Sequence, residues 1–246
     1  MADELTIDAL TAGWTITQRR KGHRHSTDDL LTGWYAAEVN PDATRILDLG
    51  SGIGSVGLIA LWRSPRATLV AIEVQEISFA LLTTNIARNG LGSRVRAIHG
   101  DLREVRLPDA FDLVTGSPPY WDVSEGVVPA DSQKAHARFE LRGDVRDYAL
   151  AARAALAEGG RFVFCFPTVQ RARAEAACVD AELAVTRSRD VIPRAGAAPL
   201  FTLFACRRTE DGPEAHVVEP PHVVRDEHGA PTEMHAAARA TLGFTS

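Results

Sequence analysis

The chain has 246 residues, of which 45% are hydrophobic, and this is enough for one large domain with a sizeable core. Its 27 Lys and Arg against 32 Asp and Glu give a formal net charge of −5, which excludes a protein that coats nucleic acid. Recognition of one folded RNA loop stays open, because it needs only a local basic face.

The apolar runs of the chain, such as Phe162 to Phe166, have the length of strands and are too short to span a membrane. The Met-Ala-Asp-Glu start lacks the basic and apolar stretches of a secretory signal, so we expect a cytoplasmic protein. Cys165, Cys178 and Cys206 form no Cys-x-x-Cys pair, and two of them lie in strand-like runs. We therefore expect buried reduced thiols, with no bound metal and no disulfide.

Residues 1–44 are expected to form an N-terminal extension, with a helix from about Asp28 to Glu38 over the ligand-binding end of the fold. From Arg45, β-rich runs alternate with helical patterns, which is typical of a mostly parallel sheet covered on both faces. The expected strands are Arg45 to Leu49, Thr68 to Glu73, Val95 to Ile98, Phe111 to Thr115, Arg161 to Phe166, Leu183 to Arg189 and Leu200 to Arg207. The expected helices are Ser55 to Trp62, Glu76 to Asn89, Val145 to Glu158 and Val169 to Val179.

Only a loop, Val191 to Pro199, joins the last two strands, so they should be antiparallel. The Glu158-Gly159-Gly160 sequence is interpreted as a helix stop before the fifth strand. Five parallel strands followed by an antiparallel hairpin resemble the Rossmann-like α/β fold of class I methyltransferases, with seven strands and an antiparallel last strand. Residues 45–208 would form this domain, and residues 209–246 a tail packed on it, with a helix from Thr232 to Ala240.

A glycine-rich turn follows the first expected strand and precedes the first helix of the domain. Glycines let the backbone approach a ligand at the carboxyl end of this strand, where open α/β sheets bind. Glu73 ends the second strand, where its carboxylate can accept both ribose hydroxyls, and Asp101 follows the third, where it could receive an adenine amino group. These spaced strand ends predict a site for an adenosyl cofactor, built from Asp48, Gly50, Ser51, Gly52, Gly54, Glu73, Asp101 and Leu102.

A rigid turn, Ser117-Pro118-Pro119-Tyr120, ends the fourth strand. Proline fixes its own φ and biases the preceding residue toward extended geometry, so the Pro118 carbonyl is aimed with little freedom. The side chain of Ser117 and this carbonyl can accept the two N–H groups of an aromatic amine, and Tyr120 can stack on the base. These four residues are the candidate catalytic residues for methyl transfer to an amino nitrogen.

This turn resembles the Asp/Asn/Ser-Pro-Pro-Tyr/Phe motif of amino-group methyltransferases that use S-adenosylmethionine. Within that group the chain is most similar to bacterial methyltransferases that modify N6 of the adenine beside the anticodon of valine tRNA. Three further stretches carry the closer resemblance: Gln18 to Leu31, Ala137 to Glu140 and Asp226 to Glu233.

The resemblance implies that His23, Arg24, Thr27 and Asp28 form walls of the cofactor and target pocket. For Asp28, a carboxylate that stabilises a helix N-terminus is an equal alternative. The chain also departs from the family pattern. Ser117 stands where asparagine is usual, His25 and Phe139 replace the commoner Phe and His, and the order of Pro231 and Thr232 is reversed.

The preferred hypothesis is methylation of adenine N6 in structured RNA, most of all tRNA, because a loop base can be splayed out and stacked. Another amine, namely a cytosine amino group, a protein glutamine or a small metabolite, stays an alternative, as does a non-catalytic cofactor-binding subunit. The long segment Trp121 to Arg146 favours a substrate-covering element. Candidate phosphate contacts, each with a solvated surface as alternative, are Arg19, Arg20, Lys21, Arg138, Arg142 and Arg146.

Overall fold

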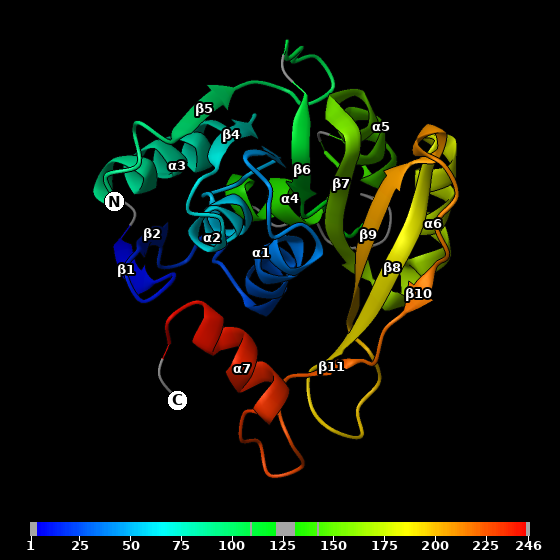
Figure 1. Cartoon of the computed structure of the whole chain (residues 1–246). Coiled ribbons are helices and arrows are strands. Elements are labelled where there is room, and N and C mark those ends of the chain that lie inside the picture. The colour runs from blue at the N-terminus through cyan, green and yellow to red at the C-terminus, as the bar shows by residue number, and fades with distance from the viewer. Residues whose placement is uncertain (1–3, 109, 122–130, 142, 245–246) are drawn as a thin grey trace.

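The computed structural model describes residues 4–108, 110–121, 131–141 and 143–244, with the side chains at 136–138 excepted. A twisted mixed sheet forms its centre (Figure 1). Across the sheet the strands are β5 (Val95–His99), β4 (Thr68–Glu73), β3 (Arg45–Leu49), β6 (Phe111–Gly116), β7 (Leu156–Pro167), β9 (Phe201–Arg208), β8 (Leu183–Ile192) and β10 (Val217–Val218). β11 (His222–Val223) also pairs with β8, further along that strand.

The sheet confirms the predicted fold class. Strands β5, β4, β3, β6 and β7 are parallel, and β8 and β9 form the expected antiparallel pair. The chain passes from β7 to the outer strand β8 and then returns, so that β9 lies antiparallel between β7 and β8. All seven expected strands are present, although β7 and β8 are longer than the sequence pattern indicated.

Helices cover both faces of the sheet. The helices α1 (Thr27–Val39), α2 (Ser55–Arg63) and α3 (Glu76–Arg88) contribute to one hydrophobic core, whereas α5 (Val145–Ala155) and α6 (Arg171–Asp180) contribute to the other. Successive strand residues alternate between these two cores, because side chains along a strand point to opposite faces. In β7, for example, Val163 and Cys165 face the first core, while Phe162, Phe164 and Phe166 face the second.

The junction between α5 and β7 differs from the prediction. Helix α5 ends at Ala155, and the Glu158-Gly159-Gly160 sequence lies inside β7, so its interpretation as a helix stop was wrong. Pairing with β6 shifts register between Phe111 and Leu113 at this point. A side chain at Gly160 would place its Cβ 2.9 Å from the Phe111 carbonyl oxygen, so the glycine permits a close approach of two strands.

The N-terminal extension contains a hairpin that the sequence patterns did not predict. Strands β1 (Leu5–Ala9) and β2 (Thr15–Arg19) are antiparallel and precede α1. Helix α3 binds β2 through Asn85, whose carboxamide accepts from the Thr17 amide at 2.7 Å and donates to its carbonyl at 3.2 Å. Asn89 makes the equivalent pair with Thr15, at 2.9 and 2.8 Å. The outer edge of β2 is therefore satisfied by helix side chains rather than by a third strand.

The C-terminal tail runs along the β8 edge of the sheet and ends in α7 (Glu233–Thr241). Thr232 accepts from the His235 amide at 3.2 Å, so it is the N-cap of this helix. The helix then reaches the β1–β2 hairpin, where the Ala12 amide donates to the Leu242 carbonyl at 2.9 Å (Figure 1). Among the residues that the structure describes, no helix is long and apolar enough to cross a membrane.

Candidate functional site

A cavity of about 640 Å³ lies at the carboxyl ends of β3, β4 and β6. Its walls come from the glycine turn after β3, the end of β4, the turn after β6, the segment before α1 and helix α4 (Ser132–Arg138). The predicted site residues that line it are His23, Arg24, Asp28, Asp48, Gly50, Ser51, Gly52, Glu73, Leu102, Ser117, Pro118, Pro119 and Tyr120. The structure thus brings together most residues singled out in the sequence, whereas Thr27, Gly54 and Asp101 lie outside this wall.

The glycine turn has backbone angles that side chains rarely adopt. Gly50, Gly52 and Gly54 have φ values of 58°, 56° and 97°. A Cβ at Gly50 would lie 1.9 Å from the Tyr148 hydroxyl, so this position has no room for a side chain. At Gly52, by contrast, no described atom lies within 4 Å of a Cβ position. The backbone at Gly52 is therefore open to a ligand, which can approach it closely.

Glu73 ties the end of β4 to the glycine turn. Its carboxylate accepts from the Gly52 amide at 2.7 Å and from the Gln75 amide at 2.6 Å. The side chain is almost completely buried, and this burial raises the pKa of Glu73 to about 7, against the lowering effect of the two hydrogen bonds. A buried carboxylate of this kind gains when a ligand offers hydroxyl donors to it.

Asp48 lies beneath the glycine turn and supports it. One carboxylate oxygen accepts from the Thr115 hydroxyl at 2.7 Å, and the other accepts from the Gly57 amide at 3.1 Å. Burial raises the pKa of Asp48 to about 6. The contacts join the ends of β3 and β6 to helix α2 and so stabilise the glycine turn.

Asp101 has another partner in the structure. Its carboxylate binds the Arg103 guanidinium through bonds of 2.9 and 2.5 Å, while its neighbours Gly100 and Leu102 line the cavity. The adenine contact predicted for Asp101 stays a prediction, and it requires the carboxylate to leave or share Arg103.

The turn Ser117-Pro118-Pro119-Tyr120 lines the same cavity as the glycine turn. The two prolines are buried, whereas Ser117 and Tyr120 are partly exposed. The Tyr120 hydroxyl donates to Asp28 at 2.9 Å, and its ring meets Phe166 edge-on with centroids 6.0 Å apart. Asp28 lies in the first turn of α1, so both roles weighed for it apply: it lines the cavity and carries negative charge at a helix N-terminus.

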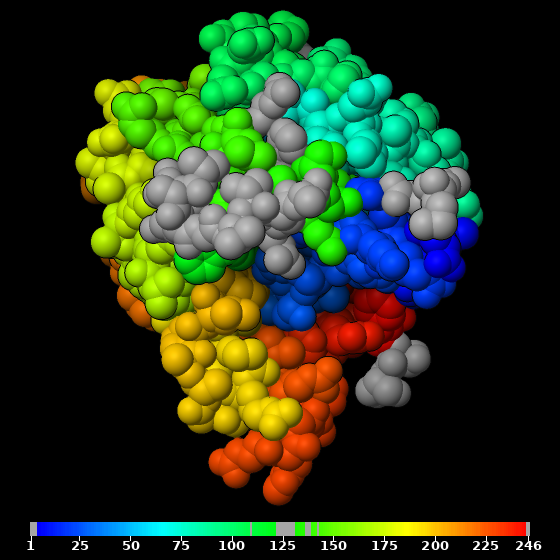
Figure 2. All heavy atoms as spheres, turned by 180° about the vertical axis from the view of Figure 1, so that it is seen from behind, coloured from blue at the N-terminus to red at the C-terminus, as the bar shows by residue number. Residues whose placement is uncertain are grey.

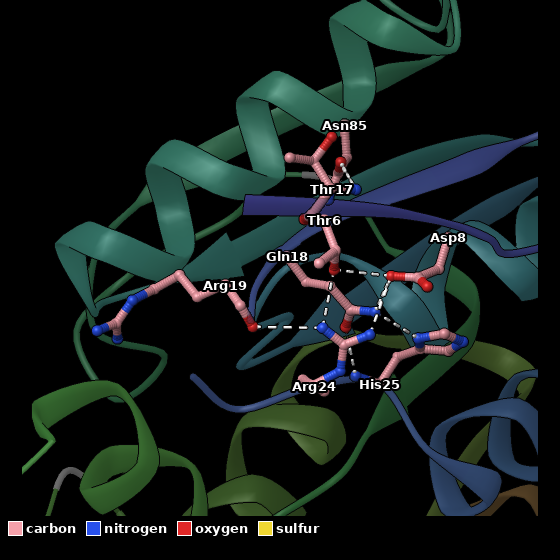
Figure 3. A network of polar contacts seen from close by, with 8 residues as sticks. All are labelled: Thr6, Asp8, Thr17, Gln18, Arg19, Arg24, His25 and Asn85. Atoms are coloured by element: carbon pink, nitrogen blue, oxygen red, sulfur yellow. Dashed lines mark hydrogen bonds and ion pairs between the residues drawn. The ribbon is translucent and has the colours of Figure 1, made fainter. Parts of the chain in front are cut away.

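The hairpin holds the segment before α1 in place (Figure 3). The Arg24 guanidinium donates to the Thr6 hydroxyl at 2.8 Å and to the Asp8 carboxylate at 3.0 Å, so both partners belong to β1. The His25 amide donates to the Gln18 side chain at 3.0 Å. Arg24 thus contributes to the wall of the cavity while its charge is bound by the hairpin.

Helix α4 closes another side of the cavity. The Gln133 side chain accepts from the His23 amide at 3.3 Å and donates to the Ser78 hydroxyl at 3.3 Å. Arg19 binds the Asp131 carboxylate at 2.8 Å, which anchors the start of α4 on β2. Seen from behind, the N-terminal segment lies directly beside the residues around α4 (Figure 2).

The residues predicted to contact phosphate lie in different environments. Arg19 is 8% exposed and bound to Asp131, so it acts in this structure as an internal anchor. Arg20 pairs with Glu4 at the surface, at 2.8 Å, and Lys21 is exposed at the cavity. Arg142 and the Arg138 side chain lie outside the described residues, and Arg146 pairs with Asp180 at 2.9 Å.

Several cavity residues escaped the sequence analysis, among them Asp29, Gln75, Ser78, Gln133 and Tyr148. Asp29 and Tyr148 are buried polar residues on helices, and no local pattern marks them as ligand-binding. The pKa of Asp29 is raised by burial and by the neighbouring charge of Asp28. A weak signal existed for Asp29, since Ser26 and Asp29 have the spacing of a capping box, which the structure contains.

These features fit S-adenosylmethionine, the cofactor expected from the sequence. A carboxylate at the end of β4 suits ribose hydroxyls, and the open backbone at Gly52 permits close approach. The acidic groups Asp28, Asp48 and Glu73 favour a ligand with positive charge.

The comparisons with known proteins agree with this geometry. The family model of the methyltransferase small domain matches residues 29–144. A tRNA1(Val) (adenine(37)-N6)-methyltransferase from Bacteroides thetaiotaomicron is 29% identical over 200 residues, which are 81% of this chain and 83% of that protein. A protein of the same name from Histophilus somni is 28% identical over 199 residues, which are 79% of this chain and 81% of that protein.

Solved structures show the same fold. A predicted O-methyltransferase from Agrobacterium tumefaciens aligns with a TM-score of 0.69 and 18% identity over 88% of this chain and 97% of that chain. A putative RNA methyltransferase from Pyrococcus horikoshii aligns with a TM-score of 0.55 and 18% identity over 77% of this chain and 88% of that chain. By its sequence, the chain is similar to the bacterial tRNA1(Val) (adenine(37)-N6)-methyltransferases, and its residues 29–144 match the methyltransferase small domain.

Proposed function

We propose that the protein transfers a methyl group from S-adenosylmethionine to N6 of an adenine in tRNA. The observation that carries this proposal is the position of the Ser117-Pro118-Pro119-Tyr120 turn, which lines the same cavity as the glycine turn and Glu73. The names of the relatives supply the RNA and the base. Residues 45–208 would form the catalytic domain, with 1–44 as an N-terminal extension and 209–246 as a tail packed on the domain.

The cofactor half of the cavity would be held by the ends of β3, β4 and β5. In this proposal Glu73 would accept hydrogen bonds from the ribose hydroxyls, and the backbone around Gly52 would hold the amino-acid part. S-adenosylmethionine, when bound, supplies a methyl group activated by its sulfonium charge. Asp48 keeps the glycine turn in position through its bonds to Thr115 and Gly57.

The target half would be formed by the turn after β6. An adenine amino group is a poor nucleophile, because its lone pair is delocalised into the ring. Acceptance of its two N–H groups by the Ser117 hydroxyl oxygen and the Pro118 carbonyl would bring the nitrogen toward tetrahedral geometry and orient the lone pair. Tyr120 would stack on the base, an interaction of about 1–3 kcal/mol in single-stranded nucleic acid recognition.

The rim of the cavity offers contacts for RNA outside the flipped base. Lys21, Lys134 and Trp121 line the cavity, and Trp121 is 41% exposed. We infer that the lysines bind phosphates and that the indole stacks on a neighbouring nucleotide. A local basic rim of this kind is compatible with the net charge of −5.

The test is incubation of the protein with labelled S-adenosylmethionine and separate pools of tRNA, ribosomal RNA, DNA and protein, followed by nucleoside analysis. We expect N6-methyladenosine in the tRNA pool. If the label appears instead in cytidine, in glutamine or in a free metabolite, the substrate is that amine and not adenine in tRNA. The substitution of Ser117 for the usual asparagine favours this alternative, because the shorter side chain changes the target pocket.

A further inference from the structure

Four polar side chains form a continuous row behind the target half of the cavity. The Ser117 hydroxyl lies 3.4 Å from the Cys165 sulfur, and that sulfur lies 3.3 Å from the Tyr120 hydroxyl. The Tyr120 hydroxyl in turn lies 2.9 Å from the Asp28 carboxylate. The row joins β6 and β7 to the first turn of α1.

Each of the three contacts in the row can contain one proton. Because the carboxylate at one end accepts only, it fixes which group donates in every contact. An ionised carboxylate only accepts hydrogen bonds, so Tyr120 donates its single proton to Asp28. The Tyr120 oxygen then has no proton for Cys165, so a hydrogen bond between these two groups takes its proton from the thiol, which the Thr32 hydroxyl also approaches. The Cys165 proton is used in that bond, so the Ser117 hydroxyl must donate to the sulfur.

We propose that Asp28, Tyr120 and Cys165 form a one-directional hydrogen-bond chain that holds the Ser117 hydroxyl as an acceptor toward the target amine. The inference rests on the proposed function for the identity of that amine. The proton of Ser117 points to Cys165, so its oxygen lone pairs are left for the cavity. Asp28 and Cys165 are positioning residues, since they act through Tyr120 and Ser117.

The surroundings of the row support this direction. Asp28 accepts a second hydrogen bond, from the Ser26 hydroxyl, so donors approach both of its oxygens. Cys165 is fully buried, and burial together with the charge of Asp28 raises the pKa of its thiol to about 12. The thiol therefore keeps the proton that the chain requires.

The hydrogen-bond chain gives a reason why serine can stand where the family usually has asparagine. A carboxamide oxygen is an acceptor by its own chemistry, whereas a hydroxyl can donate or accept according to its rotation. The hydrogen-bond chain fixes the rotation of the Ser117 hydroxyl, so that the hydroxyl favours a group with N–H donors. A ring nitrogen without a proton would meet only lone pairs at Ser117 and is selected against.

A double-mutant cycle tests the proposal by turnover of tRNA. Cys165→Ala should lower kcat about ten-fold, with the KM for S-adenosylmethionine unchanged, because the Ser117 hydroxyl becomes free to rotate. In a Ser117→Ala background the same substitution should have no further effect. Cys206→Ala, which removes another fully buried thiol outside the row, is the matched control and should retain kcat. An equal loss from Cys165→Ala in both backgrounds would refute the chain.

Infrared spectroscopy tests the row without any substrate. The S–H stretching band of Cys165 is identified by its disappearance in Cys165→Ala. Tyr120→Phe removes the acceptor of the thiol, so the band should shift to higher frequency, whereas Cys206→Ala should leave it unchanged. An unshifted band in Tyr120→Phe overturns the proposed direction. Absence of N6-methyladenosine in tRNA would refute the proposed function alone, since the infrared result does not depend on it.

Discussion

The charge of Glu73 should affect both the free energy of unfolding and the affinity for the cofactor. The substitution Glu73→Gln allows the two effects to be measured separately. Burial raises the pKa of this carboxyl from 4.5 to about 7. Each pKa unit corresponds to about 1.4 kcal/mol, so the difference between the folded and unfolded protein is worth about 3 kcal/mol. The side chain is 6% exposed, and solvent screening is therefore weak.

Because folding raises the pKa of Glu73, the folded protein becomes less stable as pH rises. Between about pH 4.5 and about pH 7 the folded protein holds a proton on Glu73 that the unfolded chain has lost, so the free energy of unfolding falls as pH rises. In Glu73→Gln this fall should be absent, while the contribution of Asp48 is common to both proteins. The glutamine loses one acceptor for the amides of Gly52 and Gln75, which subtracts about 1–3 kcal/mol at every pH. The pH-dependent difference isolates the charge.

Urea denaturation of the ligand-free protein at a series of pH values measures this difference. Relative to wild type, Glu73→Gln should gain about 3 kcal/mol in free energy of unfolding between about pH 4.5 and about pH 8. The nearby exposed Glu76→Gln is the matched control and should follow the wild-type curve. Parallel curves for wild type and Glu73→Gln would show that burial does not perturb Glu73, and the reasoning would be wrong.

Calorimetry with S-adenosylhomocysteine tests the binding role of the same carboxylate. Wild-type affinity should increase as pH rises through about 7, with release of a proton, because the ionised form accepts the ribose hydroxyls. Glu73→Gln should weaken binding by about 1.5–3 kcal/mol and remove the pH dependence of this contact. Equal affinity of the two proteins at each pH would place the ribose elsewhere.

Three further predictions concern the target, the RNA and the glycine turn. Ser117→Ala should lower kcat about 10- to 100-fold with unchanged affinity for S-adenosylhomocysteine, and wild-type turnover would exclude its hydroxyl as acceptor. Ser117→Asn should keep adenine methylation if serine is a variant of the same site; loss of activity would indicate a pocket for a smaller residue and another amine. Replacing Lys21 and Lys134 by Ala should make tRNA binding less sensitive to salt. The slope of the logarithm of the binding constant against the logarithm of salt concentration should become shallower by about one unit per phosphate contact, and an unchanged slope would remove both lysines from the interface. Gly50→Ala should lower the free energy of unfolding by at least about 1 kcal/mol, measured in urea, because its Cβ would lie 1.9 Å from the Tyr148 hydroxyl at a φ of 58°; an equally stable variant would contradict this.

Local sequence patterns predicted the sheet strands from β3 to β9 and most helices, because burial period and turn residues act within one element, but they did not predict β10 and β11. The patterns failed where two strands approach each other, as at Gly159 and Gly160, which look like a helix stop but lie within β7. They also missed the hairpin, in which the edge of β2 away from β1 is bound by Asn85 of α3 and by Asn89, the C-cap of that helix.

The sequence by itself determined the glycine turn and the Ser117-Pro118-Pro119-Tyr120 turn, because each depends on backbone angles that its own residues prefer. It also placed Glu73 at the end of a strand, because the β-rich run that begins at Thr68 ends there. Only the tertiary structure decided what surrounds them. Residues 48 positions apart, Ser117 and Cys165, meet because β6 and β7 are neighbours in the sheet, and the sulfur decides how the hydroxyl is oriented. Arg19, a phosphate candidate in the sequence, became an internal anchor because α4 brought Asp131 to it. Such pairings depend on which elements pack together, and no local pattern contains that information.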